Sequence, residues 1–168
     1  MAINVGDRLP GGTLNEFIEV ETEGCSVGPN TFKVEDMAKG KKIVIFGLPG
    51  AFTPTCSAKH VPSYLNNFEA LKAKGVDEIW CLSVNDAFVM GAWGREQRAG
   101  GKVRMMADGS AEYVKKLGLE NDMTARGMGV RSQRFSMLVD DGVVKSINVE
   151  APGKFEVSDG GTMLRILG

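Results

Sequence analysis

The sequence predicts an α/β fold in which a central mixed β-sheet is flanked by helices. Short apolar, β-branched runs typical of buried strands recur along the chain, amphipathic helical patterns separate them, and a β-hairpin followed by a helix ends the chain. Such alternation indicates a sheet covered by helices on both faces. With 168 residues the chain has the length of one domain that buries its own core. We therefore expect residues 1–168 to form a single domain.

The N-terminal part of the chain is expected to add strands outside the central sheet. Residues 1–32 are rich in Gly, Asn, Thr and Glu and contain short alternating pieces, such as 16–20. This pattern predicts an N-terminal hairpin or irregular β layer with Cys25 in or near a turn. Residues 33–39 are expected to form one or two helical turns before the first central strand.

The first central strand and the helix after it determine where the chemistry lies. Residues 43–46 form an apolar run bounded by glycine and proline, which predicts a buried strand. Thr53 is a good helix N-cap, and Pro54 suits the first helical position because its missing N–H costs nothing there. Apolar residues then recur at helical spacing until Gly75, at Val61, Tyr64, Leu65, Phe68 and Leu71. Cys56 is therefore expected in the first turn of this helix.

The second half of the chain continues the alternation and then changes. The expected elements are a buried strand over 78–84, a helix capped by Asp86 and ending near Gly100-Gly101, a short strand over 103–107, a helix over 111–117 capped by Ser110 and stopped by Gly118, strands over 134–139 and 143–149 joined by a turn at Asp141-Gly142, and a helix over 159–167. A β-α-β half followed by a hairpin and a helix is the thioredoxin-like plan, here with an N-terminal β extension and an inserted helix around Trp93.

Charge and cysteine content exclude several classes of protein. The net charge is −1 and no basic cluster exceeds two residues, so we expect no nucleic-acid or membrane partner. The chain does not begin with a basic and then apolar leader, and glycine or proline interrupts its apolar runs before spanning length, which favours a cytoplasmic protein. Cys25, Cys56 and Cys81 are odd in number and widely spaced, which favours free thiols or a redox role over a disulfide framework.

Cys56 has two interpretations. A lone cysteine is most often a small buried apolar residue. At a helix start, however, unpaired N–H groups and the helix dipole favour an anion, so the thiol there should be unusually acidic. Thr53 adds a hydroxyl one turn earlier. Because Thr53 and Lys59 occupy the positions three before and three after Cys56, the Cys-x-x-Cys dithiol of ordinary disulfide exchange is absent.

Residues 49–60, Pro-Gly-Ala-Phe-Thr-Pro-Thr-Cys-Ser-Ala-Lys-His, resemble the peroxidatic signature of the peroxiredoxins, in the form of the type II (Prx5-like) subfamily. Supporting segments are Cys81-Leu-Ser-Val-Asn-Asp-Ala-Phe-Val-Met, Trp93-Gly, Lys102-Val-Arg-Met-Met-Ala-Asp and Arg134-Phe-Ser-Met-Leu-Val-Asp-Asp-Gly. The resemblance covers nearly the whole chain and is closest to plant-like and bacterial glutaredoxin- or thioredoxin-dependent members. It implies a thiol peroxidase that reduces hydrogen peroxide and alkyl hydroperoxides without cofactor or metal.

The resemblance also implies a role for each matching residue. Cys56 would be the peroxidatic thiolate that attacks the peroxide and becomes a sulfenic acid, and Thr53 would hydrogen-bond thiolate and peroxide. Pro49 would shield the site from water. Arg134 would hold the thiolate and the charge on the departing oxygen. Only the match to the Arg-Phe-Ser segment selects Arg134 over Arg131, for which a solvated surface charge is the simpler interpretation.

His60, the single histidine, lies one turn after Cys56 on the same helix face. A Cys–His nucleophile pair is one interpretation; the simpler one is that His60 orients a loop or packs near the site entrance. A zinc site made of this histidine and the three cysteines is disfavoured because Cys25 and Cys81 do not form a close pair. Cys81 is expected to be a core thiol.

The sequence departs from the two-cysteine members of the family, since no cysteine follows Cys81. The resemblance then implies that glutathione with glutaredoxin, or thioredoxin, reduces oxidised Cys56, with Cys25 or Cys81 as the less favoured resolving thiol. It also implies a homodimer, for which Phe88, Val89, Trp93 and the surroundings of Phe52 are candidate interface residues. The simpler interpretation is that these residues fill the core, and for Phe88 and Val89 the sequence does not separate the two. The alternative function is a thioredoxin-fold redox-sensing or binding module that relays Cys56 oxidation to a partner.

Overall fold

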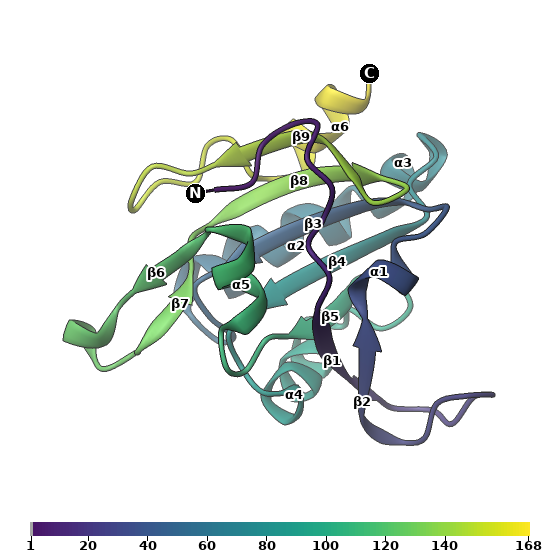
Figure 1. Cartoon of the computed structure of the whole chain (residues 1–168), viewed down its shortest axis with the longest axis vertical. Helices are drawn as coiled ribbons and strands as arrows, with labels where there is room; N and C mark the ends of the chain where they lie inside the picture. The colour runs from purple at the N-terminus through teal and green to yellow at the C-terminus, as the bar shows by residue number, and fades with distance from the viewer. Residues whose placement is uncertain (1) are drawn as a thin grey trace.

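A seven-stranded mixed sheet forms the centre of the protein in this computed structural model, which describes residues 2–168 (Figure 1). The strands of this sheet are β1 (Thr13–Ile18), β2 (Gly28–Lys33), β3 (Lys42–Leu48), β4 (Glu78–Ser83), β5 (Arg104–Ala107), β8 (Phe135–Asp140) and β9 (Val143–Val149), and β6 (Glu120–Asp122) and β7 (Val130–Ser132) form a separate pair. The helices are α1 (Val34–Met37), α2 (Val61–Asn66), α3 (Phe68–Ala73), α4 (Ala87–Gln97), α5 (Glu112–Leu117) and α6 (Gly160–Leu167), with a π-helical turn η1 (Cys56–His60) and a 3₁₀ turn η2 (Thr124–Arg126).

The strand order is β2-β1-β5-β4-β3-β8-β9. Strands β3, β4 and β5 run parallel and are joined by helical crossovers, whereas β8, β9, β1 and β2 pair antiparallel on either side. The predicted thioredoxin-like α/β fold with a mixed central sheet, an N-terminal β extension and an inserted helix, α4, is thus confirmed.

Apolar side chains cover both faces of the sheet. Alternate residues of β3 point to opposite sides, so that Ile43 and Ile45 belong to one core cluster and Val44 and Phe46 to the other. The first cluster includes α5 and the N-terminal segment, which lie in front of the sheet in Figure 1. The second includes residues of α2, α3, α4 and α6 together with Cys56. The candidate site therefore lies on the second face.

Several predicted elements differ in their ends. The helix expected from the Cys56 region to Gly75 is interrupted at Asn67, where φ is −104° and ψ is 10°, and so divides into α2 and α3. α4 ends at Arg98, which adopts the left-handed conformation with φ of 57°, rather than at Gly100-Gly101. The side chain of Asp108, not Ser110, caps α5, because it accepts hydrogen bonds from the backbone N–H groups of Tyr113 and Val114.

The small β6–β7 hairpin was not predicted. Its strands have three residues each and lie outside the central sheet. Such short, partly exposed strands carry too little apolar alternation to be recognised. Among residues 2–168, no helix is both long enough and apolar enough to cross a membrane.

Candidate functional site

Cys56 lies where the carboxyl end of β3 leads into a helix. Helical structure begins at Pro54, and the backbone carbonyl of Thr53 accepts from the N–H of Ser57 at 3.0 Å, so Thr53 occupies the predicted N-cap position. Cys56 opens the π-helical turn η1, in which the N–H of Val61 donates to the Cys56 carbonyl. Turns of this kind are rare and occur often at functional sites. The side chain of Cys56 is fully buried.

Strand pairing places Arg134 beside this cysteine. β8 runs antiparallel to β3 with Phe135 opposite Gly47, so the residue just before β8 lies at the carboxyl end of β3. From there the Arg134 guanidinium Nη2 donates to Cys56 Sγ at 3.2 Å. Among residues 2–168, the ion pairs within 4.0 Å involve other cations, so no carboxylate neutralises Arg134. Its charge is available to a thiolate.

His60 lies on the other side of the same guanidinium. Arg134 Nη1 lies 2.8 Å from His60 Nδ1, and His60 Nε2 lies 3.1 Å from the carbonyl oxygen of Ser158. Since arginine only donates and a carbonyl only accepts, the ring is neutral with its proton on Nε2. Burial and the Arg134 charge lower the pKa of His60 to about 3, which agrees with this state. Both ring nitrogens are engaged, so the structure does not support a Cys–His nucleophile pair.

Thr53 and Pro49 lie in the loop that joins β3 to the cysteine helix. The Thr53 hydroxyl donates to the Gly50 carbonyl at 2.7 Å and not to Cys56 sulfur, so the expected contact with the thiol is not made in this structure. Pro49 is half-buried, and its carbonyl accepts from Arg131 Nη1 at 3.2 Å. Arg131 is therefore not simply a solvated charge, because it holds the loop that carries Pro49.

Helix α4 braces the start of the cysteine helix. Trp93 is fully buried, and its indole Nε1–H donates to the hydroxyl of Ser57 at 3.0 Å. Of the two interpretations of Trp93, the structure thus supports the core residue and not the interface residue. By contrast, Phe52 and Phe88 are exposed by 53% and 65%. Phe52 also has a φ of 63°, a conformation that is uncommon for a bulky residue.

The two other cysteines have different environments. Cys25 lies in the β1–β2 loop, is partly exposed, and forms an isolated bridge with Thr22. Cys81 is buried in β4, and burial, followed by the neighbouring Cys56, raises the pKa of its thiol well above the usual value. This confirms Cys81 as a core thiol. Within residues 2–168, no three His, Cys, Asp or Glu side chains gather in a way that could hold a metal ion.

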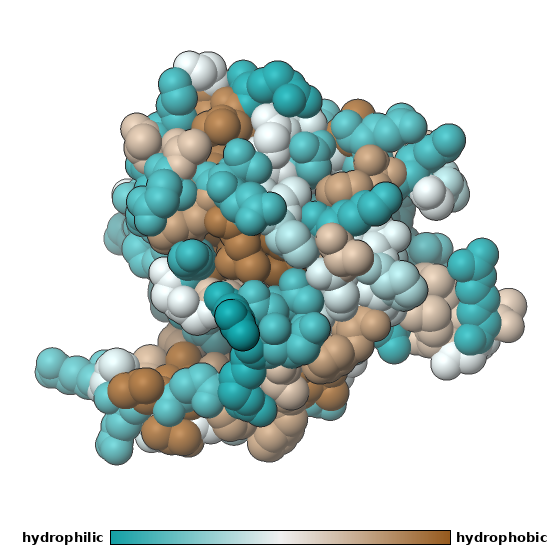
Figure 2. All heavy atoms as spheres, turned by 180° about the vertical axis from the view of Figure 1, so that it is seen from behind, coloured by the Kyte–Doolittle hydropathy of each residue, from teal (hydrophilic) through white to brown (hydrophobic). Residues whose placement is uncertain are grey.

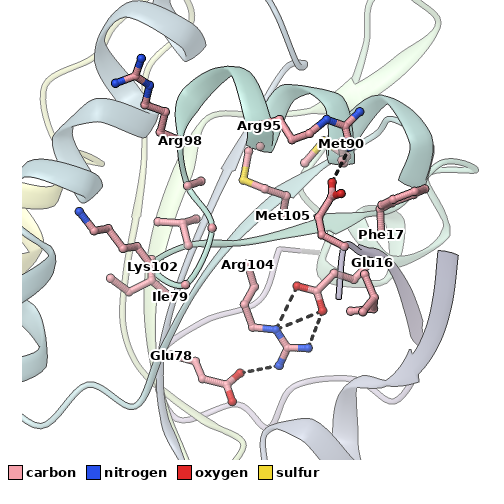
Figure 3. Close-up of a pocket in the computed structure, with 18 of the residues that line it drawn as sticks. Glu16, Phe17, Glu78, Ile79, Met90, Arg95, Arg98, Lys102, Arg104 and Met105 are labelled. Carbon is pink, nitrogen blue, oxygen red and sulfur yellow. Dashed lines mark hydrogen bonds and ion pairs between the residues drawn. The ribbon is translucent and has the colours of Figure 1, made fainter. Parts of the chain in front are cut away.

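A cavity of about 500 Å³ lies away from this cysteine, between α4 and the beginnings of β4 and β5 (Figure 3). None of the motif residues lines it. Its central charge is Arg104, which contacts the carboxylates of Glu16 at 2.6 Å and Glu78 at 3.0 Å. Arg95 is paired with Glu19. These two arginines are thus paired within the protein, whereas Arg98 and Lys102, which also line the cavity, form no ion pair within residues 2–168.

Comparisons with known proteins agree with this geometry. Residues 4–164 match the Redoxin family. The chain is 50% identical to peroxiredoxin-2B of Arabidopsis thaliana over 165 residues, covering 98% of both chains. It superposes on reduced Prx3 of Vibrio vulnificus in complex with H₂O₂ with a TM-score of 0.91 and 48% identity, covering 99% of both.

One similar structure carries a different description. A crystal structure from Burkholderia cenocepacia, described as a candidate thioredoxin reductase, superposes with a TM-score of 0.97 and 62% identity, covering 98% of both chains. Dithiol exchange of the kind that acts on thioredoxin commonly uses a Cys-x-x-Cys motif. This chain has Thr53 and Lys59 at the corresponding distances from Cys56, so its own residues do not support that description.

Proposed function

Because the chain belongs to the Redoxin family and, within it, to the peroxiredoxins, we propose that Cys56 is its peroxidatic cysteine and Arg134 the cation that activates it. The protein is a thiol-dependent peroxidase. The observation that supports these residue roles is the 3.2 Å contact between Arg134 Nη2 and Cys56 Sγ. A half-buried guanidinium beside a sulfur at a helix start favours the thiolate, which is the nucleophilic form.

The first chemical step is attack of the Cys56 thiolate on one oxygen of a hydroperoxide. An S–O bond forms as the O–O bond breaks, and the departing hydroxide or alkoxide takes up a proton to leave as water or an alcohol. Cysteine is thereby oxidised to a sulfenic acid. Arg134 supplies fixed N–H donors where negative charge develops, and arginine offers the rigid fork that lysine lacks.

Thr53 and Pro49 act on the peroxide rather than on the sulfur. The Thr53 hydroxyl already donates to Gly50, so its oxygen remains an acceptor for the O–H of a bound peroxide. Pro49 is the residue we propose to shield the sulfur from water, and Arg131 donates to the Pro49 carbonyl. Cys56 has no exposed surface, so the residues around it must move when a peroxide enters.

An outside thiol completes the cycle. It attacks the sulfenic sulfur of Cys56, an S–S bond forms and water leaves; a second thiol then breaks this mixed disulfide and returns the Cys56 thiol. Cys81 is poorly suited to this step because burial keeps its thiol protonated. Glutathione with glutaredoxin, or thioredoxin, is the reductant we propose, in a reducing compartment such as the cytoplasm where free cysteines persist.

Mass spectrometry after one equivalent of hydrogen peroxide tests these assignments. We expect the wild-type protein to gain one oxygen on Cys56 and the Cys56→Ser variant to leave peroxide unconsumed. Turnover is then measured with glutathione plus glutaredoxin and with thioredoxin. If Cys56 is oxidised but neither reductant supports turnover, the redox-sensing alternative replaces the proposed cycle.

We also propose a homodimer that forms through Phe52 and Phe88. Both are exposed, and both come from segments that flank the cysteine helix. On the face opposite to that of Figure 1, Figure 2 shows apolar surface broken up by hydrophilic residues. Phe88→Lys should shift the protein to a monomer in sedimentation, whereas a monomeric wild-type protein would contradict the proposal.

A further inference from the structure

His60 is fully buried and takes no part in the chemical step described above, although it touches the residue that does. Its ring packs between aromatic neighbours, with its centroid 4.8 Å from that of Phe46 and 5.0 Å from that of Phe155. Packing alone would be served by a third aromatic ring. The two polar contacts of the imidazole therefore call for another explanation.

The C-terminal segment 150–158 provides the acceptor for the Nε2 proton of His60. The Ser158 carbonyl that lies 3.1 Å from Nε2 also accepts from the hydroxyl of Tyr64 at 2.7 Å. Ser158 is itself held by Glu150, whose carboxylate accepts from the Ser158 N–H at 2.8 Å and from its hydroxyl at 2.7 Å.

Glu150 is the centre around which this segment folds. Besides Ser158, its carboxylate accepts from the backbone N–H groups of Glu156 and Val157, at 2.9 to 3.0 Å. Its own N–H donates to the backbone carbonyl of Arg134 at 2.9 Å. Segment 150–158, which is far along the chain from Cys56, thus contacts the main chain of Arg134 directly and its side chain through His60.

We propose that Glu150 and His60 are positioning residues that aim Arg134 at the peroxidatic sulfur. Glu150 holds the Ser158 carbonyl against Nε2–H of His60, which fixes the tautomer in which Nδ1 is an acceptor. Nδ1 in turn holds Arg134 Nη1, so that Nη2 faces Cys56. This inference rests on the proposed role of Arg134. In metal sites, removing a residue that orients a metal ligand indirectly typically lowers metal affinity or activity by about 10- to 100-fold. We expect an effect of similar size here.

Three substitutions of His60 separate positioning from packing. His60→Asn retains an acceptor close to the place of Nδ1, whereas His60→Gln keeps a polar atom only near Nε2. His60→Phe fills the aromatic space and has no acceptor. We expect the rate constant for oxidation by peroxide to fall by roughly tenfold or more in the Phe and Gln variants, with thiolate absorbance appearing at higher pH. The Asn variant should retain most of both properties.

A role in packing alone predicts the opposite order, with His60→Phe closest to the wild type and His60→Asn most impaired. That order, or a wild-type rate and thiolate titration in His60→Phe, would overturn the proposal. Measuring Cys56→Ser in parallel separates the proposed function from the positioning role. If Cys56→Ser abolishes peroxide consumption while His60→Phe reacts normally, the proposed function stands and only the positioning role fails.

Glu150→Gln tests the same series of contacts at Glu150, the residue farthest from Arg134. This test remains possible even if a His60 variant folds poorly. Gln keeps the size of Glu150 but replaces one acceptor oxygen with a donor group. We expect a several-fold slower peroxide reaction, while Glu156→Gln, in the same loop and with an exposed side chain, serves as the matched control. In a His60→Phe background, Glu150→Gln should have no further effect on the rate. An equal loss in both backgrounds would show that Glu150 does not act through His60.

Discussion

At the scale of single residues, the site depends on a guanidinium that makes two different contacts at once. Arg134 donates to Cys56 Sγ through Nη2 and to His60 Nδ1 through Nη1. We expect Arg134→Ala to slow oxidation by peroxide by about 10²- to 10³-fold, the usual cost of removing one donor to a developing oxyanion. Arg134→Lys should recover little of this loss, because a single ammonium cannot span both contacts.

Stopped-flow measurement of peroxide consumption, with enzyme in excess, gives this rate constant directly. Arg126→Ala is the control, since Arg126 is exposed in η2 and lies outside the site. An Arg134→Ala variant that reacts as fast as Arg126→Ala would mean that the activating cation has been wrongly assigned.

The neutral state of His60 makes stability depend on pH in a defined direction. In the unfolded chain His60 binds a proton below its ordinary pKa of 6.5, whereas in the folded protein burial and Arg134 lower the pKa to about 3. Between these values the unfolded state holds more protons, so stability falls as pH falls, by at most about 1.4 kcal/mol per pH unit.

Urea unfolding of the wild type and of His60→Phe across this pH range measures the effect. The Glu150 and Asp159 carboxylates, whose negative charge partly favours a protonated His60, are present in both proteins. The difference between the two slopes therefore isolates His60, and the wild type should lose stability more steeply on acidification. Parallel slopes would contradict a buried neutral imidazole.

Sequence reasoning reached Cys56 but could not define its neighbours. The helix start and the adjacent Thr53 were readable from local spacing. Choosing between Arg131 and Arg134 required the register of β8 against β3, which pairs Phe135 with Gly47 and which a local pattern does not contain. For His60 a usable signal did exist, because it lies four residues after Cys56; what the spacing could not reveal is that its partner is Arg134 rather than the cysteine.

At the scale of elements, the contact between β3 and β8 depends on the absence of a side chain at Gly47. A Cβ atom there would lie 2.1 Å from Cε1 of Phe135, which is fully buried and adjoins Arg134. Gly47→Ala should therefore destabilise the protein by about 1–3 kcal/mol through overpacking. It should also slow peroxide oxidation, because any shift of Phe135 moves Arg134.

Urea denaturation and the peroxide rate constant, measured on the same samples, test this prediction. Gly100→Ala is a matched control, since a Cβ at Gly100 would meet no atom within 4 Å and its φ is not in the left-handed region. The steric interpretation fails if the two alanine variants have the same stability.

The elements differ in how far their sequences specify them. Strands β3, β4, β8 and β9 were predicted within a few residues because their apolar character is local, as is the Asp141-Gly142 turn, in which both residues have positive φ. The π-helical turn η1 and the break at Asn67 were not predicted. Both arise from packing of the cysteine helix against the sheet and α4, for instance through the Trp93–Ser57 hydrogen bond, and such tertiary effects override helical spacing.

At the scale of the whole molecule, the sheet brings together segments that are remote in sequence. The carboxyl ends of the parallel strands β3 and β4 lie at the same end of the sheet, and β8 begins there. Segment 150–158 contacts His60 on the side away from Arg134. Four separate regions thus define the surroundings of one sulfur. This explains why the motif around Cys56 indicates the chemistry while the rest of the site appears only in the folded chain.

We expect the same arrangement to keep the other two cysteines out of the catalytic cycle. Cys81 lies inside β4, where burial raises the pKa of its thiol. Cys25 lies in the loop that joins β1 to β2, and these two strands are at the opposite edge of the sheet from β8 and β9. We therefore expect a Cys25→Ser, Cys81→Ala double variant to turn over hydrogen peroxide with glutathione and glutaredoxin, or with thioredoxin, at the wild-type rate. Alanine is chosen at Cys81 because a serine hydroxyl buried there could lack a partner.

Steady-state turnover of the double variant, together with the mass of the wild-type protein after one equivalent of peroxide, tests this expectation. An internal disulfide in the wild type, or loss of turnover but not of the first oxidation in the double variant, would mean that one of these thiols resolves Cys56 after the loop or strand that carries it has moved.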